Sequence, residues 1–338
     1  MAVPLVGSAP VPGLQALAGA RDMLFGAAVR ADLLERDPAY RAAVARECGV
    51  LTPELEMKWA WLEPRPGEWH WWDVDQIAAF ARGAGKQLHG HALLWHQSIP
   101  EWARSSLLER RDWDPVQRFI AATMARYPAL TWDVVNEPME MGYRMDGLRP
   151  SPFLHALGSS YIARAFHAAR AAAPDARLFL NEYDIDYDLP AQRDRRYLLL
   201  KLLERLKVAG VPIDGLGIQA HLDLVHQEAF DRRTLGAFLD AVGALGLEIR
   251  ISELDVRDSA GIHLPPLVRQ RRAADAVTAY LEVALDNRAV GTVSCWGISD
   301  RHSWLGDTQS LPLDGDYAPT AVHVAIASAL QQRAVNAA

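Results

Sequence analysis

The sequence predicts an α/β protein that folds as a single (β/α)8 TIM barrel. Eight short apolar segments recur along the 338 residues, segments with helical spacing of apolar residues lie between them, and no Pro/Gly/Ser-rich linker divides the chain. Alternating strands and helices indicate parallel strands joined by crossover helices. Eight such units fit a closed barrel better than an open sheet.

The expected strands are short runs rich in β-branched and other apolar residues, as is typical of strands buried on both faces. In chain order they are Met23–Val29, Val50–Thr52, Gln87–Leu94, Thr131–Val135, Arg177–Leu180, Gly215–Gln219, Glu248–Ser252 and Val293–Trp296. The expected helices carry apolar residues three and four positions apart. They are Val74–Ala84, Val116–Tyr127, Tyr161–Ala173, Asp194–Ala209, Ala229–Ala244 and Arg271–Asp286.

We expect one catalytic domain over residues 1–338, in which about residues 1–20 form an N-terminal extension. This N-terminus lacks the charged region of a secretory signal. The sequence leaves open whether the protein is cytoplasmic or is secreted or periplasmic after removal of a leader. Two cysteines, Cys48 and Cys295, lie far apart and show no metal-binding spacing, and a bridge between them also stays open.

Composition limits the classes of partner. Half of the residues are apolar, which allows a large core. The net charge of −7 makes nucleic acid an unexpected partner. No apolar run reaches the length of a membrane span, so we expect no membrane contact.

Two glutamates point to the chemistry. Glu137 ends the run Thr131-Trp132-Asp133-Val134-Val135-Asn136-Glu137, and Glu253 follows the strand-like run 247–252. Active sites of (β/α)8 barrels lie at the carboxyl ends of the strands. A retaining glycosidase needs two carboxyl groups there, one as acid/base and one as nucleophile. The chain also has 11 tryptophans, whose faces stack on sugar rings.

Several motifs in one order resemble family 10 of the glycoside hydrolases, the retaining endo-β-1,4-xylanases. They are Glu56-Met57-Lys58-Trp59, Glu63-Pro64-Arg65-Pro66-Gly67, His89-Gly90-His91 with Trp95-His96, Trp132 to Glu137, Gln219-Ala220-His221, Ser252-Glu253-Leu254-Asp255, and Trp296-Gly297-Ile298-Ser299-Asp300 with Ser303-Trp304. The resemblance as a whole extends from about residue 23 to residue 330.

The resemblance implies a role for each catalytic group. Glu137 would be the acid/base and Glu253 the nucleophile that forms a glycosyl-enzyme, with their carboxyl groups about 5–5.5 Å apart. Asn136 would bind the sugar 2-hydroxyl. His221 would contact Glu253, and Asp255 would orient His221 from its other ring nitrogen.

The resemblance also implies how the sugar chain is bound. Further substrate-binding residues would be Glu54, Lys58 and His91 on the glycone side, Gln219 at the central ring, Tyr183 on the aglycone side, and the walls Trp95, Trp296 and Trp304. The implied partner is xylan or xylo-oligosaccharide, bound by a monomer without cofactor or metal.

The fifth strand ends in Asn181-Glu182-Tyr183-Asp184 instead of the family's usual Asn-Asp-Tyr-Asn, and two further positions depart from the family pattern. These changes leave the sugar specificity open. Leu55 replaces an asparagine that binds the second glycone sugar, and Leu305 replaces a common arginine. We expect the change at Leu55 to cost about one hydrogen bond, roughly 0.5–1.5 kcal/mol. The main alternative is therefore a related endo-β-1,4-glycanase acting on glucan or a bacterial exopolysaccharide.

Other polar residues near the strand ends favour simpler interpretations. His89 and His96 are interpreted mainly as structural histidines, and Glu140 and Glu182 as acidic residues outside the site. The pair His89-x-His91 could also indicate a metal-dependent hydrolase, which would be inactivated by EDTA. A carbohydrate-binding protein without catalysis would have lost Glu137 or Glu253, and both are present.

Overall fold

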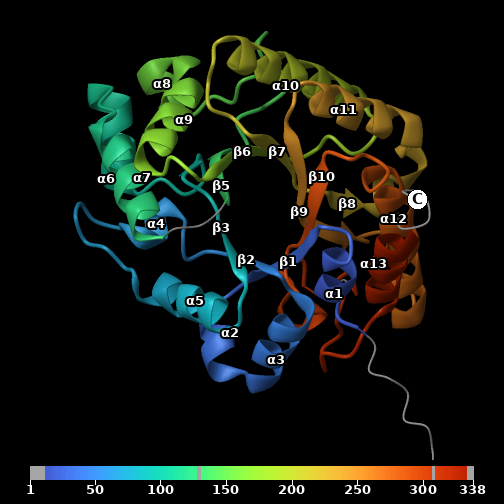
Figure 1. Cartoon of the computed structure of the whole chain (residues 1–338). Helices are drawn as coiled ribbons and strands as arrows, with labels where there is room; N and C mark the ends of the chain where they lie inside the picture. The colour runs from blue at the N-terminus through green and yellow to red at the C-terminus, as the bar shows by residue number, and fades with distance from the viewer. Residues whose placement is uncertain (1–11, 128–130, 307–308, 333–338) are drawn as a thin grey trace, which may run out of the picture.

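The computed structural model describes residues 12–127, 131–306 and 309–332, and its parallel strands close into a barrel inside a ring of helices (Figure 1). The barrel strands are β1 (Leu24–Val29), β2 (Val50–Pro53), β3 (Gln87–Gly90), β5 (Thr131–Asn136), β6 (Arg177–Glu182), β7 (Gly215–Ile218), β9 (Glu248–Arg257) and β10 (Val290–Cys295). Each pairs with the next, β10 pairs with β1, and β9 pairs with β10 to close the ring. The predicted (β/α)8 fold is confirmed.

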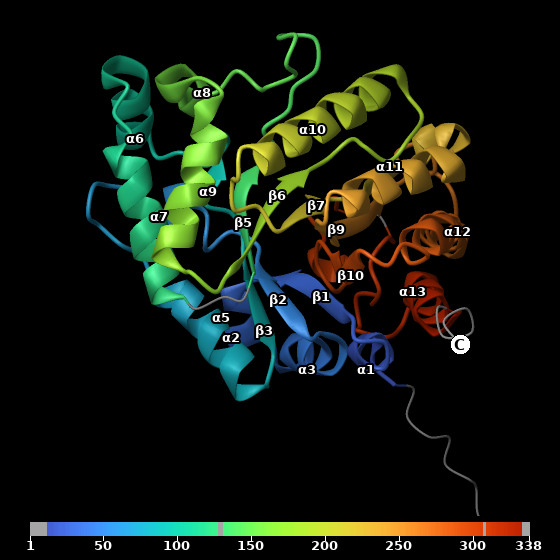
Figure 2. The same cartoon turned by 45° about the horizontal axis from the view of Figure 1, so that its top comes forward.

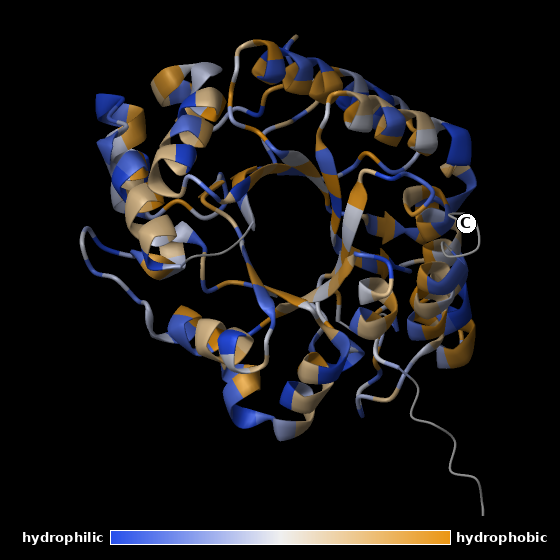
Figure 3. Cartoon of the chain, viewed as in Figure 1, coloured by the Kyte–Doolittle hydropathy of each residue, from blue (hydrophilic) through white to orange (hydrophobic). Residues whose placement is uncertain are grey.

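Long helices cover the outside of the barrel (Figures 1 and 2). They are α3 (Pro38–Glu47), α5 (Trp72–Gly83), α7 (Asp114–Arg126), α9 (Ser160–Ala172), α10 (Pro190–Val208), α11 (Arg232–Ala244), α12 (Pro266–Ala284) and α13 (Ala321–Gln332). Shorter helices are α1 (Leu14–Gly19), α2 (Ala31–Arg36), α4 (Trp59–Leu62), α6 (Glu101–Ser105) and α8 (Pro152–Leu157). Hydrophobic residues predominate around the ring of strands, whereas the helices carry both kinds (Figure 3). The helices therefore bury their apolar sides against the barrel.

The predicted strand Gln87–Leu94 is interrupted in the structure. β3 ends at Gly90, and the short strand β4 (Leu94–Trp95) resumes pairing with β5. Gly90 pairs with Trp132 and Leu94 with Val135, so β4 starts four residues later while its partner advances by three. One extra residue in a strand is a bulge, which re-aims the side chains that follow it.

Strand β9 is longer than the predicted Glu248–Ser252 because it acquires a second partner. The short strand β8 (His221–Asp223) pairs with its outer end, with His221 opposite Asp255. Glu253 and Asp255 therefore lie within β9 rather than beyond it. The predicted helix Ala229–Ala244 also differs, since a 3-10 helix (Leu224–Ala229) precedes α11.

The N-terminal part of the described chain packs against the barrel. Leu14 and Ala18 of α1 are fully buried, and the Leu14 N–H donates to the Glu47 carboxylate over 2.8 Å. Residues from Leu14 on thus belong to the barrel, whereas residues 1–11 of the expected extension lie outside the described residues. Cys48 and Cys295 are buried free thiols. None of the described helices has both the length and the apolarity that a bilayer span requires.

A polar cluster occupies the lower part of the barrel interior. Asp133 Oδ2 lies 2.8 Å from His89 Nε2 and 2.9 Å from His91 Nδ1. Burial would raise the pKa of Asp133, but these two histidines outweigh it and lower the pKa. Burial and the charge of Arg250 lower the pKa of His89 to about 4, so His89 is neutral at pH 7. The cluster supports the structural interpretation of His89.

Gly90 offers a test of the close packing at the bulge. A Cβ at this position would overlap the indole ring of Trp132, which is fully buried. We predict that Gly90→Ala lowers the free energy of unfolding by about 1–3 kcal/mol or more through overpacking. Urea denaturation measures this. The control is Gly83→Ala in α5, where a Cβ meets no described atom within 4 Å. An equal effect of both changes would contradict the packing explanation.

Candidate active site

A cavity of about 440 Å³ opens at the carboxyl ends of the strands. Its lining includes every residue predicted for catalysis or substrate binding: Glu54, Lys58, His91, Trp95, Asn136, Glu137, Tyr183, Gln219, His221, Glu253, Trp296 and Trp304. Leu55 and Gln97 also line it. Seven barrel strands and the segments that follow them, including the short strands β4 and β8, supply these side chains. The fold thus gathers them from 251 residues of sequence, from 54 to 304.

Glu137 directly follows β5 in an unusual backbone conformation, with φ of 54°. Its N–H donates to the Asn181 carbonyl over 2.8 Å. Its Oε1 accepts from Gln219 Nε2 at 3.1 Å and from Asn136 Nδ2 at 3.3 Å. His96 Nδ1 lies 3.9 Å from its other oxygen. Amide donors and one histidine thus surround this carboxyl group.

Glu253 is held differently, as a buried carboxylate. Its Oε1 accepts from Asn181 Nδ2 over 2.6 Å, and its Oε2 lies 3.3 Å from His221 Nε2. Burial alone would raise the pKa of Glu253, but the hydrogen bond to His221 and the charges of His91 and His221 lower it. Glu253 is therefore ionised at neutral pH, as a nucleophile must be.

His221 connects Glu253 to a second carboxylate. Its Nδ1 lies 2.8 Å from Asp255 Oδ1, and Asp255 Oδ2 accepts from Trp304 Nε1 over 2.6 Å. Burial would lower the pKa of His221, but Asp255 and Glu253 raise it well above its usual value. The predicted contacts of His221 with Glu253 and Asp255 are present in the structure.

The predicted glycone side carries a buried cation between aromatic rings. Lys58 Nζ lies 4.5 Å from the ring centre of Trp95 and 5.5 Å from that of Trp296. Burial lowers the pKa of Lys58, and the charges of Glu253, Glu54 and Glu137 oppose this shift. The His91 and Trp296 rings lie in a T-shaped arrangement with their centroids 5.2 Å apart. These contacts fix the two indole walls.

The predicted aglycone side continues into a second hollow of about 250 Å³, which is lined by Tyr183, Asp184, Tyr187, Gln192, His221, Leu222, Asp223, His226, Asp255, Arg257, Trp304 and Leu305. Tyr183 lines both hollows. Leu305, one of the departures from the family pattern, lies here, whereas Leu55 lies in the main cavity.

Sequence reasoning places Asn181 at the end of a strand but assigns it no role in the site. Its side chain bonds Glu253, donates to Asn136 Oδ1 over 2.9 Å and accepts from Ser252 Oγ over 2.7 Å. Asn181 stands opposite Asn136 in the β5–β6 register, a signal that requires strand pairing to be known. Glu182 lies outside both hollows, is fully buried and bonds the N–H groups of Met139 and Tyr183. Burial raises its pKa to about 8.

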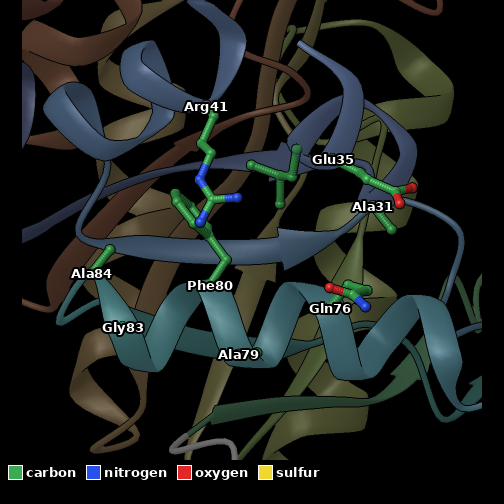
Figure 4. A pocket seen from close by; sticks show the side chains of 9 residues that line it. Ala31, Glu35, Arg41, Gln76, Ala79, Phe80, Gly83 and Ala84 are labelled. Carbon is green, nitrogen blue, oxygen red and sulfur yellow. The ribbon is translucent and has the colours of Figure 1, made fainter. Parts of the chain in front are cut away.

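His89 and His91 are engaged by a carboxylate in the structure. Both histidines direct a ring nitrogen at Asp133, and within residues 12–127, 131–306 and 309–332 no three Cys, His, Asp or Glu side chains could hold one ion. Another hollow of about 390 Å³ lies outside the barrel between α2, α3 and α5 (Figure 4). Arg41 covers the Phe80 ring there, and no predicted site residue lines it.

Comparisons with known proteins agree with this geometry. The family described as glycosyl hydrolase family 10 matches residues 13–329. Endo-1,4-beta-xylanase 3 of Hypocrea jecorina is 32% identical over 91% of this chain and 83% of its own length. Endo-1,4-beta-xylanase B of Thermotoga neapolitana is 30% identical over 87% of this chain and 84% of its own. Xylanase 10B of Thermotoga petrophila, solved in complex with xylobiose, superposes with a TM-score of 0.86 at 27% identity, covering 97% and 99% of the two chains.

The link between His221 and Glu253 predicts a pH effect. His221→Asn removes the cation that lowers the pKa of Glu253, so this pKa should rise and the acidic limb of the kcat/KM profile should move to higher pH. Loss of a hydrogen bond to a charged group, about 1.5–3 kcal/mol, would reduce kcat/KM about 10–100-fold. Rates on a soluble aryl xylobioside across the pH range measure both effects. His155→Asn, an exposed control, should change neither, and an unmoved acidic limb in His221→Asn would refute the link.

Proposed function

This chain belongs to glycosyl hydrolase family 10, and on that premise we propose that it is a retaining endo-β-1,4-xylanase in which Glu137 is the acid/base and Glu253 the nucleophile. The observation that carries these roles is the contrast between the two carboxyl groups. Glu253 is buried with a cationic partner that keeps it ionised, whereas Glu137 is surrounded by amide groups.

The first step forms the glycosyl-enzyme. A Glu253 oxygen attacks the anomeric carbon of the central sugar while the bond to the leaving oxygen breaks. Glu137 gives its proton to that oxygen, which departs as the hydroxyl of the released chain. Asn136 donates to Glu137, accepts from Asn181, which also donates to Glu253, and would bind the 2-hydroxyl of the same sugar.

The second step returns the enzyme to its starting state. Glu137, now ionised, takes a proton from water as the water oxygen attacks the anomeric carbon. The bond to Glu253 breaks, and its carboxylate again receives hydrogen bonds from Asn181 and His221. Two inversions at one carbon retain the β configuration. The separation of the two carboxyl groups, about 5–5.5 Å in this mechanism, stays a prediction.

Xylan or xylo-oligosaccharide is the partner that the relatives support, and a glucan-specific activity is not favoured by them. We further propose that a single chain suffices. What supports this is that each residue predicted for catalysis or substrate binding from the sequence of one chain also lines one cavity.

Product analysis tests the proposed reaction. Wild-type enzyme should release xylo-oligosaccharides from a β-1,4-xylan, with the β-anomer appearing first in proton NMR because the mechanism retains configuration. Glu253→Ala should lose about 10⁴-fold or more of kcat, since no nucleophile remains. First appearance of the α-anomer, or full turnover by Glu253→Ala, would contradict the proposal. A panel with β-1,4-glucan separates xylanase from glucanase activity.

Leu55 allows a test of the weakened glycone contact. Leu55→Asn should restore a polar partner for the second glycone sugar and strengthen its binding by about 0.5–1.5 kcal/mol, or roughly 2–10-fold in kcat/KM. The measurement compares an aryl xylobioside, which reaches this sugar position, with an aryl xyloside, which does not. The control is Leu267→Asn, an exposed leucine of α12. An equal gain on both substrates would show that the polar group acts elsewhere.

A further inference from the structure

We propose that Arg149 is a positioning residue for the acid/base, because its guanidinium fixes the backbone of Glu137 and the hydroxyl of Tyr183 relative to one another. The proposal rests on the proposed function, in which Glu137 protonates the leaving oxygen. Arg149 lies near the end of the loop that joins β5 to α8. This loop rises above the barrel in Figure 2.

The first argument is the backbone of Glu137. Its φ of 54° lies in the left-handed region, which a residue with a side chain keeps only when its surroundings hold it there. The N–H of Glu137 is held by the Asn181 carbonyl of the neighbouring strand. Its C=O accepts from Arg149 Nε at 2.9 Å. Arg149 therefore holds the end of the residue that sheet pairing leaves free.

The second argument is the reach of the same guanidinium along the loop. Arg149 Nη2 donates to the Met139 carbonyl over 2.9 Å, and the Arg149 N–H donates to the Pro138 carbonyl over 2.7 Å. Nη1 pairs with the Glu140 carboxylate. A guanidinium is a planar fork with fixed donor directions, so contacts with the carbonyls of Glu137 and Met139 set the curvature of the loop between them.

The third argument links the acid to the predicted aglycone side. Arg149 Nη2 also donates to the Tyr183 hydroxyl over 2.7 Å. Arg195 lies 4.5 Å from the Tyr183 ring centre and donates to the same Met139 carbonyl over 3.0 Å. Arg149 thus holds both Tyr183, which would contact the leaving sugar, and the backbone of Glu137, the proton donor. This geometry suits delivery of a proton to the oxygen between them.

Leaving-group dependence separates positioning from simple structural support. Acid assistance matters most when the leaving oxygen is basic, so a misplaced Glu137 slows release of phenol far more than release of 2,4-dinitrophenol. The readout is the ratio of kcat/KM for phenyl β-xylobioside to that for 2,4-dinitrophenyl β-xylobioside. Both rates scale with the amount of folded enzyme, so their ratio is independent of how much of a variant folds.

We expect Arg149→Lys and Arg149→Met to lower this ratio about 10–100-fold, part of the range that acid–base catalysis contributes. Lysine keeps the positive charge but lacks the planar set of donors, so we expect Arg149→Lys to affect folding less than Arg149→Met does. Arg144→Met is the matched control, because Arg144 lies in the same loop and its side chain pairs with Asp146. It should leave the ratio unchanged. An unchanged ratio in both Arg149 variants, whatever their absolute rates, would overturn the proposal.

Glu137→Ala distinguishes failure of this inference from failure of the proposed function. If Glu137 is the acid, its removal lowers the same ratio by more than either Arg149 variant does. A lowered ratio in Glu137→Ala with an unchanged ratio in both Arg149 variants would overturn the positioning role alone. An unchanged ratio in Glu137→Ala would overturn the acid assignment, and the role of Arg149 with it.

Discussion

The ionised carboxylate of Glu253, buried at the floor of the cavity, sets the requirements that its neighbours meet. A buried charge is costly unless partners donate to it. Asn181 and His221 serve Glu253, and His221 itself stays cationic because Asp255 lies on its other side. Trp304 then donates to Asp255. The contacts thus connect the carboxylate of Glu253 to the indole of Trp304. The charge of the nucleophile and the position of this cavity wall depend on the same residues.

Backbone pairing at the strand ends places the two glutamates in relation to each other. The N–H of Glu137 bonds the Asn181 carbonyl, that of Gln219 bonds the Glu182 carbonyl, and that of Glu253 bonds the Gln219 carbonyl. Backbone hydrogen bonds thus connect the end of β5 to β9 through the ends of β6 and β7. These bonds let the barrel fix the offset between the backbone N–H groups of the two glutamates, and Arg149 then holds the Glu137 carbonyl from the loop.

The sequence sufficed for the barrel and for the residues that line the cavity, because each carries a local signal: an apolar run followed by a polar motif. It did not suffice where the signal lies in pairing between distant segments. Asn181 is a site residue through its register with Asn136, and β9 extends past Ser252 only because β8 pairs with it. Arg149 follows Glu137 by 12 residues in a loop without periodic pattern, so its contact with the Glu137 carbonyl could not be predicted.

The same chain of contacts extends to the indole walls of the cavity. Xylose lacks the hydroxymethyl group that glucose carries at C5, so discrimination requires a wall that does not yield near that atom. Trp296 contacts the His91 ring and Lys58, and Trp304 donates its indole N–H to Asp255. Although Trp304 is half exposed, that bond limits its movement. Asp255 therefore has two roles: it keeps His221 charged beside the nucleophile, and it holds the indole of Trp304 at the cavity wall.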